Sequence, residues 1–229
     1  MNPATTISRA STAGPGGFVL AMTDLTFTTA RASGRAQSED RLLVQELPIG
    51  LLVIVADGAG GISGGARAAE LFIEHVRSRV ASALFEASAE QAWADLLLDA
   101  DHKVAADPTA GETTGIALLV ANAGITGASA GDSEAWIVGQ EGADVLTTAQ
   151  KRKRLGTGKA VPLAFHRASW CGTLMVATDG LFAYAQSEVL CEILDGDDLQ
   201  AAAHRLVASV QLPSGGFPDD VTVALVRGS

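Results

Sequence analysis

Two apolar runs, far apart in this chain, end in the same way. Residues 51–56 form one run, which is followed by Asp57 and a glycine. Residues 173–178 form the other, which is followed by Asp179 and a glycine. A continuous apolar run of this length, bounded by Gly, is typical of a strand that is buried on both faces. We therefore expect both aspartates at the rim of a hydrophobic core.

Acidic pairs precede two further apolar runs. Glu39 and Asp40 come shortly before residues 42–44, and Asp219 and Asp220 come directly before residues 221–226. A carboxylate at the rim of a core is costly to desolvate unless a metal ion or a basic group accompanies it. Asp-Gly is also a common turn dipeptide, so each acid taken alone fits a turn or a helix cap. Taken together, the four strand ends indicate one shared cation site.

The remaining pattern predicts two kinds of element in blocks. Further strands are expected at 18–29, 41–47, 115–121, 125–131, 134–138 and 143–146. Helices are expected at 66–85, 88–106, 187–194 and 198–210, the second of them opened by a capping box from Ser88 to Gln91. Two helical layers covering two antiparallel sheets, an α+β fold, is the simplest arrangement that buries all these faces.

Composition limits the protein to one domain of ordinary type. With 229 residues, we expect a flexible polar tail over residues 1–17 and a single domain over 18–229. No apolar run is long enough to cross a membrane, and the N-terminus has no apolar signal core, so we expect a cytoplasmic protein. Two cysteines without metal-ligand spacing predict neither a disulfide framework nor a zinc site. The net charge of −10 argues against nucleic-acid binding.

The acids at the strand ends favour a particular metal chemistry. Asp57, Asp179 and Asp219 offer hard oxygen ligands, and Gly58 could add a backbone carbonyl. Such ligands prefer Mg²⁺ or Mn²⁺ to zinc. Several acids can hold two ions roughly 3.5–4 Å apart, and a water between them is a nucleophile at neutral pH. That arrangement suits attack on a phosphate ester.

Two other features bear on phosphate binding. The glycine-rich loop at residues 58–65 lacks the Gly-Lys-Ser/Thr of a Walker loop and the third glycine of a dinucleotide fingerprint. Arg35 lies four residues before Glu39, where a guanidinium could clamp a phosphate with two hydrogen bonds. Taken alone, Arg35 also fits a solvated loop residue.

These elements, in this order, resemble the PPM-type (type 2C) metal-dependent Ser/Thr protein phosphatases. The matching segments are Arg35-x-x-x-Glu39-Asp40, Val55-Ala-Asp57-Gly58-Ala-Gly60-Gly61, Thr113-Thr114, Gly131-Asp132-Ser133, Thr178-Asp179-Gly180-Leu181 and Asp219-Asp220-Val221-Thr222. The resemblance covers most of the chain, and its motifs are collinear.

The resemblance implies a four-layer α-β-β-α sandwich with two central, mainly antiparallel sheets and two Mg²⁺ or Mn²⁺ ions at one edge. By this analogy Asp57 bridges both ions, with the Gly58 carbonyl on one of them. Asp179 and Asp219 hold the other ion. A water activated by the two metals attacks the phosphorus, without a phosphoenzyme intermediate.

The same resemblance assigns roles to four further residues. Glu39 and Asp40 act through metal-bound waters, and Arg35 binds the substrate phosphate. Asp132 matches a position that in some members belongs to a third metal.

The chain also departs from the family pattern. Ala59 stands where animal members often carry a histidine proposed to protonate the leaving group, and Glu134 replaces the usual arginine after Gly-Asp-Ser. The interval from Ser133 to Asp179 is short, so we expect the flap beside the site to be reduced or absent. The basic residues 151–154 in this interval fit either a solvated link or a groove edge that attracts acidic phosphoprotein segments.

Three functions follow as hypotheses. The first is a Mg²⁺/Mn²⁺-dependent Ser/Thr phosphoprotein phosphatase of cytoplasmic signalling, acting as a monomer without nucleic-acid or membrane partners. The second is a catalytically weak or inactive binding module on the same fold, and the third is a phosphatase of small phosphorylated metabolites.

Overall fold

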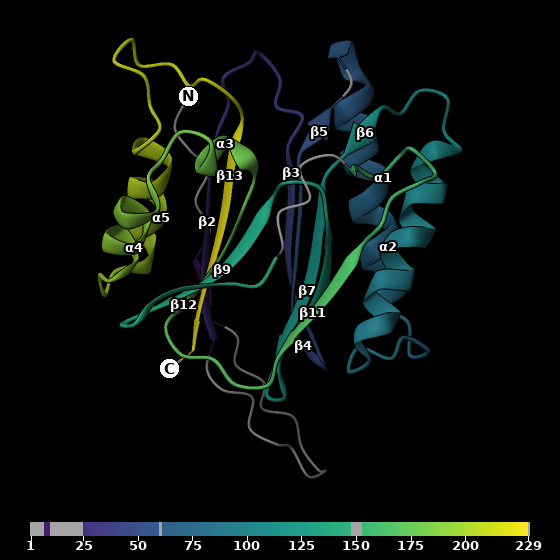
Figure 1. Ribbon diagram of the computed structural model, residues 1–229, viewed down its shortest axis with the longest axis horizontal. Helices are drawn as coiled ribbons and strands as arrows, with labels where there is room; N and C mark the ends of the chain where they lie inside the picture. The colour runs from purple at the N-terminus through teal and green to yellow at the C-terminus, as the bar shows by residue number, and fades with distance from the viewer. Residues whose placement is uncertain (1–6, 10–24, 60, 148–152, 229) are drawn as a thin grey trace.

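The computed structural model describes residues 7–9, 25–59, 61–147 and 153–228, in which two β-sheets stack between two layers of helices (Figure 1). The helices on one outer face come from the first half of the chain, and those on the other face come from its C-terminal part. The predicted α+β class and its α-β-β-α layering are confirmed.

One large sheet has six strands and the other has five, and all neighbouring strands within them are antiparallel. The first, in spatial order, contains β1 (Ile7–Arg9), β2 (Leu25–Ala32), β13 (Val221–Gly228), β12 (Thr173–Ala177), β9 (Glu134–Gly139) and β10 (Gly142–Val145). The second contains β11 (Leu163–Arg167), β8 (Gly124–Ala130), β7 (Gly115–Ala121), β4 (Gly50–Ala56) and β3 (Arg41–Leu47). A small sheet pairs β5 (Gly58–Ala59) with β6 (Glu112–Thr113).

The helices cover the outer faces of the two large sheets. Two long helices, α1 (Gly61–Val80) and α2 (Glu90–Ala105), lie on the five-stranded sheet (Figure 1). Two shorter ones, α4 (Ser187–Leu194) and α5 (Leu199–Ala208), lie on the six-stranded sheet, and α3 (Asp179–Phe182) is a single turn after β12. Each sheet is therefore covered on both faces.

This layering explains why the strands read as continuous apolar runs. Every residue of β4 is buried. Val53 faces the core between the two sheets, whereas its neighbour Ile54 faces the helices α1 and α2. Because successive side chains of a strand point to opposite faces, a strand inside a four-layer sandwich needs apolar residues at both.

Close packing between α1 and the sheet depends on a missing side chain. Phe72 on α1 is fully buried, and a Cβ atom on Gly115 of β7 would lie 2.6 Å from its Cζ atom. The same Cβ would lie 2.8 Å from a methyl group of Leu155. Gly115 thus leaves the space that two large side chains fill.

The predicted boundaries of two helices are wrong. Helix α1 begins at Gly61 and ends at Val80, so it includes part of the glycine-rich stretch that we expected to be a loop. Helix α2 begins at Glu90 after Ala89, whose side chain makes no capping hydrogen bond, so Ser88 does not open it. Tertiary packing sets these boundaries, because local signals are weak beside the burial of a helix face.

The strands agree better, and the elements that were missed are short. Strands β1, β5, β6 and β11 and the turn of helix α3 were not predicted: β5 and β6 have two residues each, only Phe165 of β11 is buried, and α3 follows directly on an apolar strand. Ile7–Arg9, inside the predicted tail, pair with β2. Residues 1–6 and 10–17 of that tail, and the part of the predicted first strand at 18–24, lie outside the described residues.

Within the described part of the chain, no helix is both long and apolar enough to cross a bilayer.

The core packing predicts a clear contrast between two substitutions. Phe72→Ala removes a fully buried ring and should lower the free energy of unfolding by about 3–5 kcal/mol. Leu84→Ala, at a side chain that is 92% exposed, should change it by less than about 0.5 kcal/mol. Urea unfolding followed by circular dichroism measures both, and equal losses would contradict the packing described here.

Candidate metal centre

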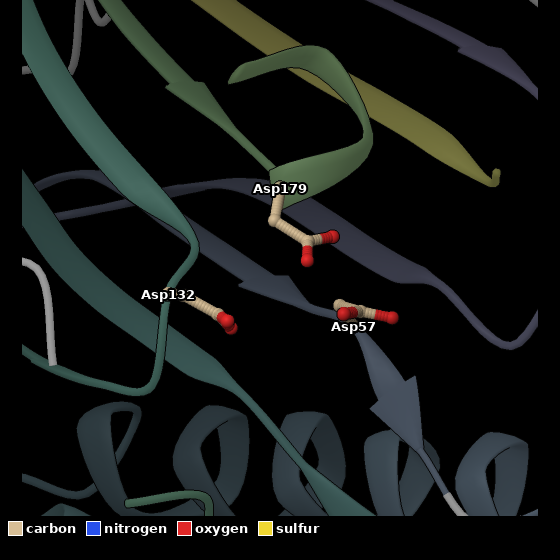
Figure 2. Close-up of side chains that lie close together, drawn as sticks. All are labelled: Asp57, Asp132 and Asp179. Carbon is tan, nitrogen blue, oxygen red and sulfur yellow. The ribbon is translucent and has the colours of Figure 1, made fainter. Parts of the chain in front are cut away.

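Three carboxylates from distant parts of the chain converge at one edge of the sandwich. Asp57 follows β4, Asp132 follows β8, and Asp179 opens α3, and each offers an oxygen atom within 4.8 Å of the others. Figure 2 shows the three side chains directed toward a common space. All three are partly buried. The two strands that read alike in the sequence thus deliver their aspartates to one place from different sheets.

The backbone of Asp57 is held by two threonines. Its N–H donates to Thr114 Oγ1 at 3.0 Å, and its carbonyl accepts from Thr114 N at 2.8 Å and from Thr113 Oγ1 at 3.0 Å. The Thr114 hydroxyl also shares a hydrogen bond of 2.6 Å with Ser133 Oγ. The motif residues Thr113, Thr114 and Ser133 therefore fix the frame that carries Asp57.

A glycine directs Asp132 toward the centre. Gly131 has a φ of +97°, a conformation that a residue with a side chain rarely adopts. A Cβ there would also lie 2.7 Å from the Thr114 Cγ2 atom. The turn between β8 and β9 can therefore bring Asp132 against the frame only because residue 131 is glycine.

Asp40 lies beneath the cluster and is fully buried. Thr178 Oγ1 donates a 2.9 Å hydrogen bond to its Oδ2 atom, whereas its Oδ1 atom has no hydrogen-bond partner. Burial raises the pKa of Asp40 to about 6, and the Thr178 hydroxyl acts in the opposite direction. Thr178, the residue before Asp179, also accepts from the backbone N–H of Thr222 at 3.0 Å, so it joins β12 to β13 below the site.

The opening motif folds against the last one. Arg35 forms ion pairs with Glu39 and, at 3.3 Å, with Asp219. Asp220 is buried and accepts from Glu39 N at 2.8 Å and from Ser33 Oγ at 2.5 Å. Asp220 therefore joins the segment before β13 to the loop of residues 33–40.

Two of the predicted ligands lie at the side of the three-carboxylate cluster. Asp219 lies outside the trio, and 37% of its side chain is exposed. Its charge nevertheless contributes to the raised pKa of Asp179, after burial and the charge of Asp132. Gly58 opens β5 opposite Thr113, and only glycine fits there because a Cβ would lie 2.3 Å from the Gly65 carbonyl oxygen.

The electrostatics of the centre call for positive charge. Burial and the neighbouring carboxylates of Asp40 and Asp179 raise the pKa of Asp57 to about 9. Like charges this close disfavour joint ionisation unless a cation accompanies them. Among the described residues, buried oxygens of Glu39, Asp40 and Asp132 have no hydrogen-bond partner. All-oxygen donors with unused lone pairs and unfavourable mutual charge fit a hard divalent cation.

A basic residue from the segment after β10 also reaches the centre. Leu155 forms an antiparallel bridge with Thr113, and the positive charge of the preceding Arg154 lowers the pKa of both Asp57 and Asp179. Residues 148–152 of this segment, including Lys151 and Arg152 of the predicted basic cluster, lie outside the described residues.

Sequence reasoning missed several supporting residues. Ser33 carries no signal of its own, and Thr178 belongs to a matched motif that does not reveal its hydrogen bond to Asp40. The sequence does not show that Asp220 joins two segments, because its neighbour Asp219 is an equally acidic residue. Glu134, where the family pattern has arginine, accepts a 2.6 Å hydrogen bond from the indole N–H of Trp136.

The fold is thus an antiparallel α-β-β-α sandwich with an acidic centre, suited to a cation, at one sheet edge. Residues 29–195 match the family model described as protein phosphatase 2C. The chain belongs to the protein phosphatase 2C family, whose members are protein-serine/threonine phosphatases.

Solved structures agree on the fold. The serine/threonine phosphatase of S. agalactiae is similar with a TM-score of 0.79 and 22% identity, covering 90% of this chain and 100% of that one. The catalytic domain of the serine/threonine phosphatase PstP, in complex with two manganese ions, is similar with a TM-score of 0.75 and 21% identity, covering 89% of this chain and 97% of that one. The phosphatase MsPP of Mycobacterium smegmatis, in complex with cacodylate, is similar with a TM-score of 0.74 and 22% identity, covering 89% of this chain and 98% of that one. A search of the curated proteins finds no match.

The site geometry predicts that Gly180 tolerates no side chain. A Cβ there would lie 2.0 Å from the carbonyl oxygen of Asp220, a backbone atom that is itself fixed by β13. Gly180→Ala should lower the free energy of unfolding by about 1–3 kcal/mol. Gly196→Ala is the matched control, because its Cβ would meet nothing closer than 3.7 Å. Equal urea midpoints for the two variants would contradict the close contact between α3 and β13.

Proposed function

We propose that this protein is a Mg²⁺- or Mn²⁺-dependent phosphatase of phosphoserine and phosphothreonine in proteins. The convergence of Asp57, Asp132 and Asp179 in a chain of the protein phosphatase 2C family carries the proposal. The PstP catalytic domain, which has the same fold, was crystallised with two manganese ions. The acids of the matched motifs, among them Asp57, Asp179 and Asp219, are all present, which favours an active enzyme over a binding module.

The donors divide into an inner and an outer group. We assign Asp57, Asp179, Asp219 and the Gly58 carbonyl to two ions, and Asp132 to a third and weaker one. Glu39 and Asp40 would contact the ions through water, using the buried oxygens that have no protein partner. When bound, the ions supply positive charge for the phosphate and make water a nucleophile at neutral pH.

The chain's own residues then bind and orient the substrate. Arg35 is the phosphate-binding group in this proposal, because 53% of its side chain is exposed beside the cluster. Its pairing with Glu39 and Asp219 holds the guanidinium in place before substrate arrives. A guanidinium oriented in this way offers two parallel N–H donors to phosphate oxygens. Ala59 offers no proton to the leaving group, so water or the substrate supplies it.

We further propose that the enzyme works in cytoplasmic signalling as a monomer, without nucleic-acid or membrane partners. Support comes from the net charge of −10, which opposes binding to polyanions. A phosphoprotein substrate follows from the family, whereas the identity of that protein does not.

Removing the bridging carboxylate should abolish activity. Asp57→Asn should lower Mn²⁺-dependent turnover of a phosphothreonine peptide by at least about 10²–10³-fold, because the variant loses charge at the centre of the cluster. Calorimetric titration should also show weakened Mn²⁺ binding. Asp95→Asn, at an exposed position of α2, is the control and should leave both unchanged. Metal-independent turnover in wild-type protein, or full activity of Asp57→Asn, would refute the proposal.

Arg35→Ala should mainly weaken substrate binding. We expect KM for p-nitrophenyl phosphate to rise by about tenfold or more, as expected for a lost hydrogen bond to a charged group, with a smaller change in kcat. Arg77→Ala, on the exposed side of α1, should behave as wild type. An unchanged KM would show that Arg35 does not bind the phosphate.

Substrate class is decided by comparing specificity constants. We expect kcat/KM for phosphothreonine and phosphoserine peptides to exceed that for common phosphorylated metabolites. The reverse order would favour a phosphatase of small molecules.

A further inference from the structure

A fully buried carboxylate on α2 holds a loop next to the metal centre. Asp101 Oδ1 accepts backbone N–H bonds from Gly156 at 2.7 Å, Thr157 at 3.0 Å and Gly158 at 3.1 Å. Its Oδ2 atom accepts from Ala160 N at 3.0 Å. Asp101 is therefore the common acceptor for four N–H groups of one loop, which we call the tethered loop (residues 156–160).

The shape of the tethered loop depends on that carboxylate. Gly156 and Gly158 have φ values of +99° and +67°, which turn successive N–H groups toward one point. Such a concave run of N–H groups is an anion-binding geometry, and here the anion is a side chain of the same protein. Without Asp101, these donors, three of them partly buried and that of Ala160 buried, would lose their acceptor. The loop would then lose the four hydrogen bonds that hold it in this conformation.

The tethered loop is joined directly to the frame of the site. Leu155, which is fully buried, exchanges backbone hydrogen bonds of 2.8 and 3.0 Å with Thr113. Thr113 in turn donates its hydroxyl to the carbonyl of Asp57 at 3.0 Å. A continuous chain of hydrogen bonds and covalent linkages thus runs from Asp101 through the loop and Leu155 to the metal centre.

Arg154 lies at the end of this chain, next to the residue that is pinned to Thr113. Its carbonyl also accepts a 3.4 Å hydrogen bond from Thr157 Oγ1 of the tethered loop. Among the described residues, its guanidinium forms no hydrogen bond or close ion pair, in contrast to that of Arg35. Its positive charge nevertheless acts on Asp57 and Asp179. Its N–H donors therefore remain available to an anion at the centre.

We propose that Asp101 is a positioning residue, which fixes the tethered loop so that Arg154 stands beside the carboxylate cluster as a second binding group for the substrate's phosphate. The inference rests on the proposed phosphatase function, because it concerns the same substrate. It also assigns a function to the short segment before β11, because that segment supplies an arginine whose neighbouring backbone is held in place by Thr113.

The tether itself is tested in metal-free protein by hydrogen exchange. In wild type the amides of residues 156, 157, 158 and 160 should exchange slowly. Asp101→Asn removes the negative charge and replaces one of the two acceptor oxygens by an NH₂ group, so exchange of these amides should accelerate while the folded circular dichroism spectrum is retained. Asp99→Asn, at an exposed position on the same helix, is the control and should leave the loop protected. Unchanged protection in Asp101→Asn would overturn the tether.

The link to substrate is tested by steady-state kinetics with p-nitrophenyl phosphate and Mn²⁺. Arg154→Ala, whose side chain is partly exposed and does not support the core, should raise KM by about tenfold with little change in kcat. Added salt should shrink that difference, because it screens the guanidinium charge. Arg154→Lys should restore part of the loss. An unchanged KM in Arg154→Ala would overturn the role of Arg154.

The double variant decides whether Asp101 acts through Arg154. If it does, Asp101→Asn should raise KM in the wild-type background but add little to Arg154→Ala. Fully additive effects would show that Asp101 acts elsewhere. A failure of the proposed function looks different, because wild-type protein would then show no Mn²⁺-dependent turnover at all, whereas the hydrogen-exchange contrast would still be present.

Discussion

Mutual repulsion among buried carboxylates is the constraint on which the rest of this structure depends. Asp57, Asp132 and Asp179 bring oxygen atoms within 4.8 Å of one another, and Asp40 lies beneath them without exposure to water. Such a cluster opposes its own formation when all its members are ionised. The fold must therefore hold the acids in place by other means, and a cation must complete them. Both requirements can be traced to particular residues.

The holding is done largely by backbone and hydroxyl contacts around the acids. Thr113 and Thr114 grip the main chain of Asp57, and Thr178 links Asp40 to the last strand. Asp220 accepts hydrogen bonds from Glu39 and Ser33 and so holds the loop that carries both. None of these contacts neutralises the centre, because none of them adds a full positive charge near all three acids. Among the described residues, Arg35 and Arg154 bring positive charge to the border of the cluster, and the remaining deficit suits divalent ions.

Sequence alone could predict the layers and the convergence of Asp57 and Asp179, because both follow from local patterns. Apolar runs marked β4 and β12 as buried strands, and the aspartates after them meet as expected. What it could not predict depends on partners distant in the chain. Helix α1 starts inside a glycine-rich stretch because its face packs on the sheet, and Asp101 looks like any helical aspartate until four N–H groups from residues 156–160 meet it. Likewise, the neighbours Asp219 and Asp220 look equivalent in sequence, yet of the two only Asp220 is buried and accepts hydrogen bonds from Glu39 and Ser33.

If the clustered carboxylates hold metal ions, anomalous diffraction from a crystal soaked in Mn²⁺ will locate those ions. We expect two strong anomalous peaks on either side of the Asp57 carboxylate, one of them also next to Asp179, with a weaker third peak near Asp132. A well-ordered crystal at neutral pH and millimolar Mn²⁺ that showed no peak within coordination distance of Asp57 would contradict this expectation.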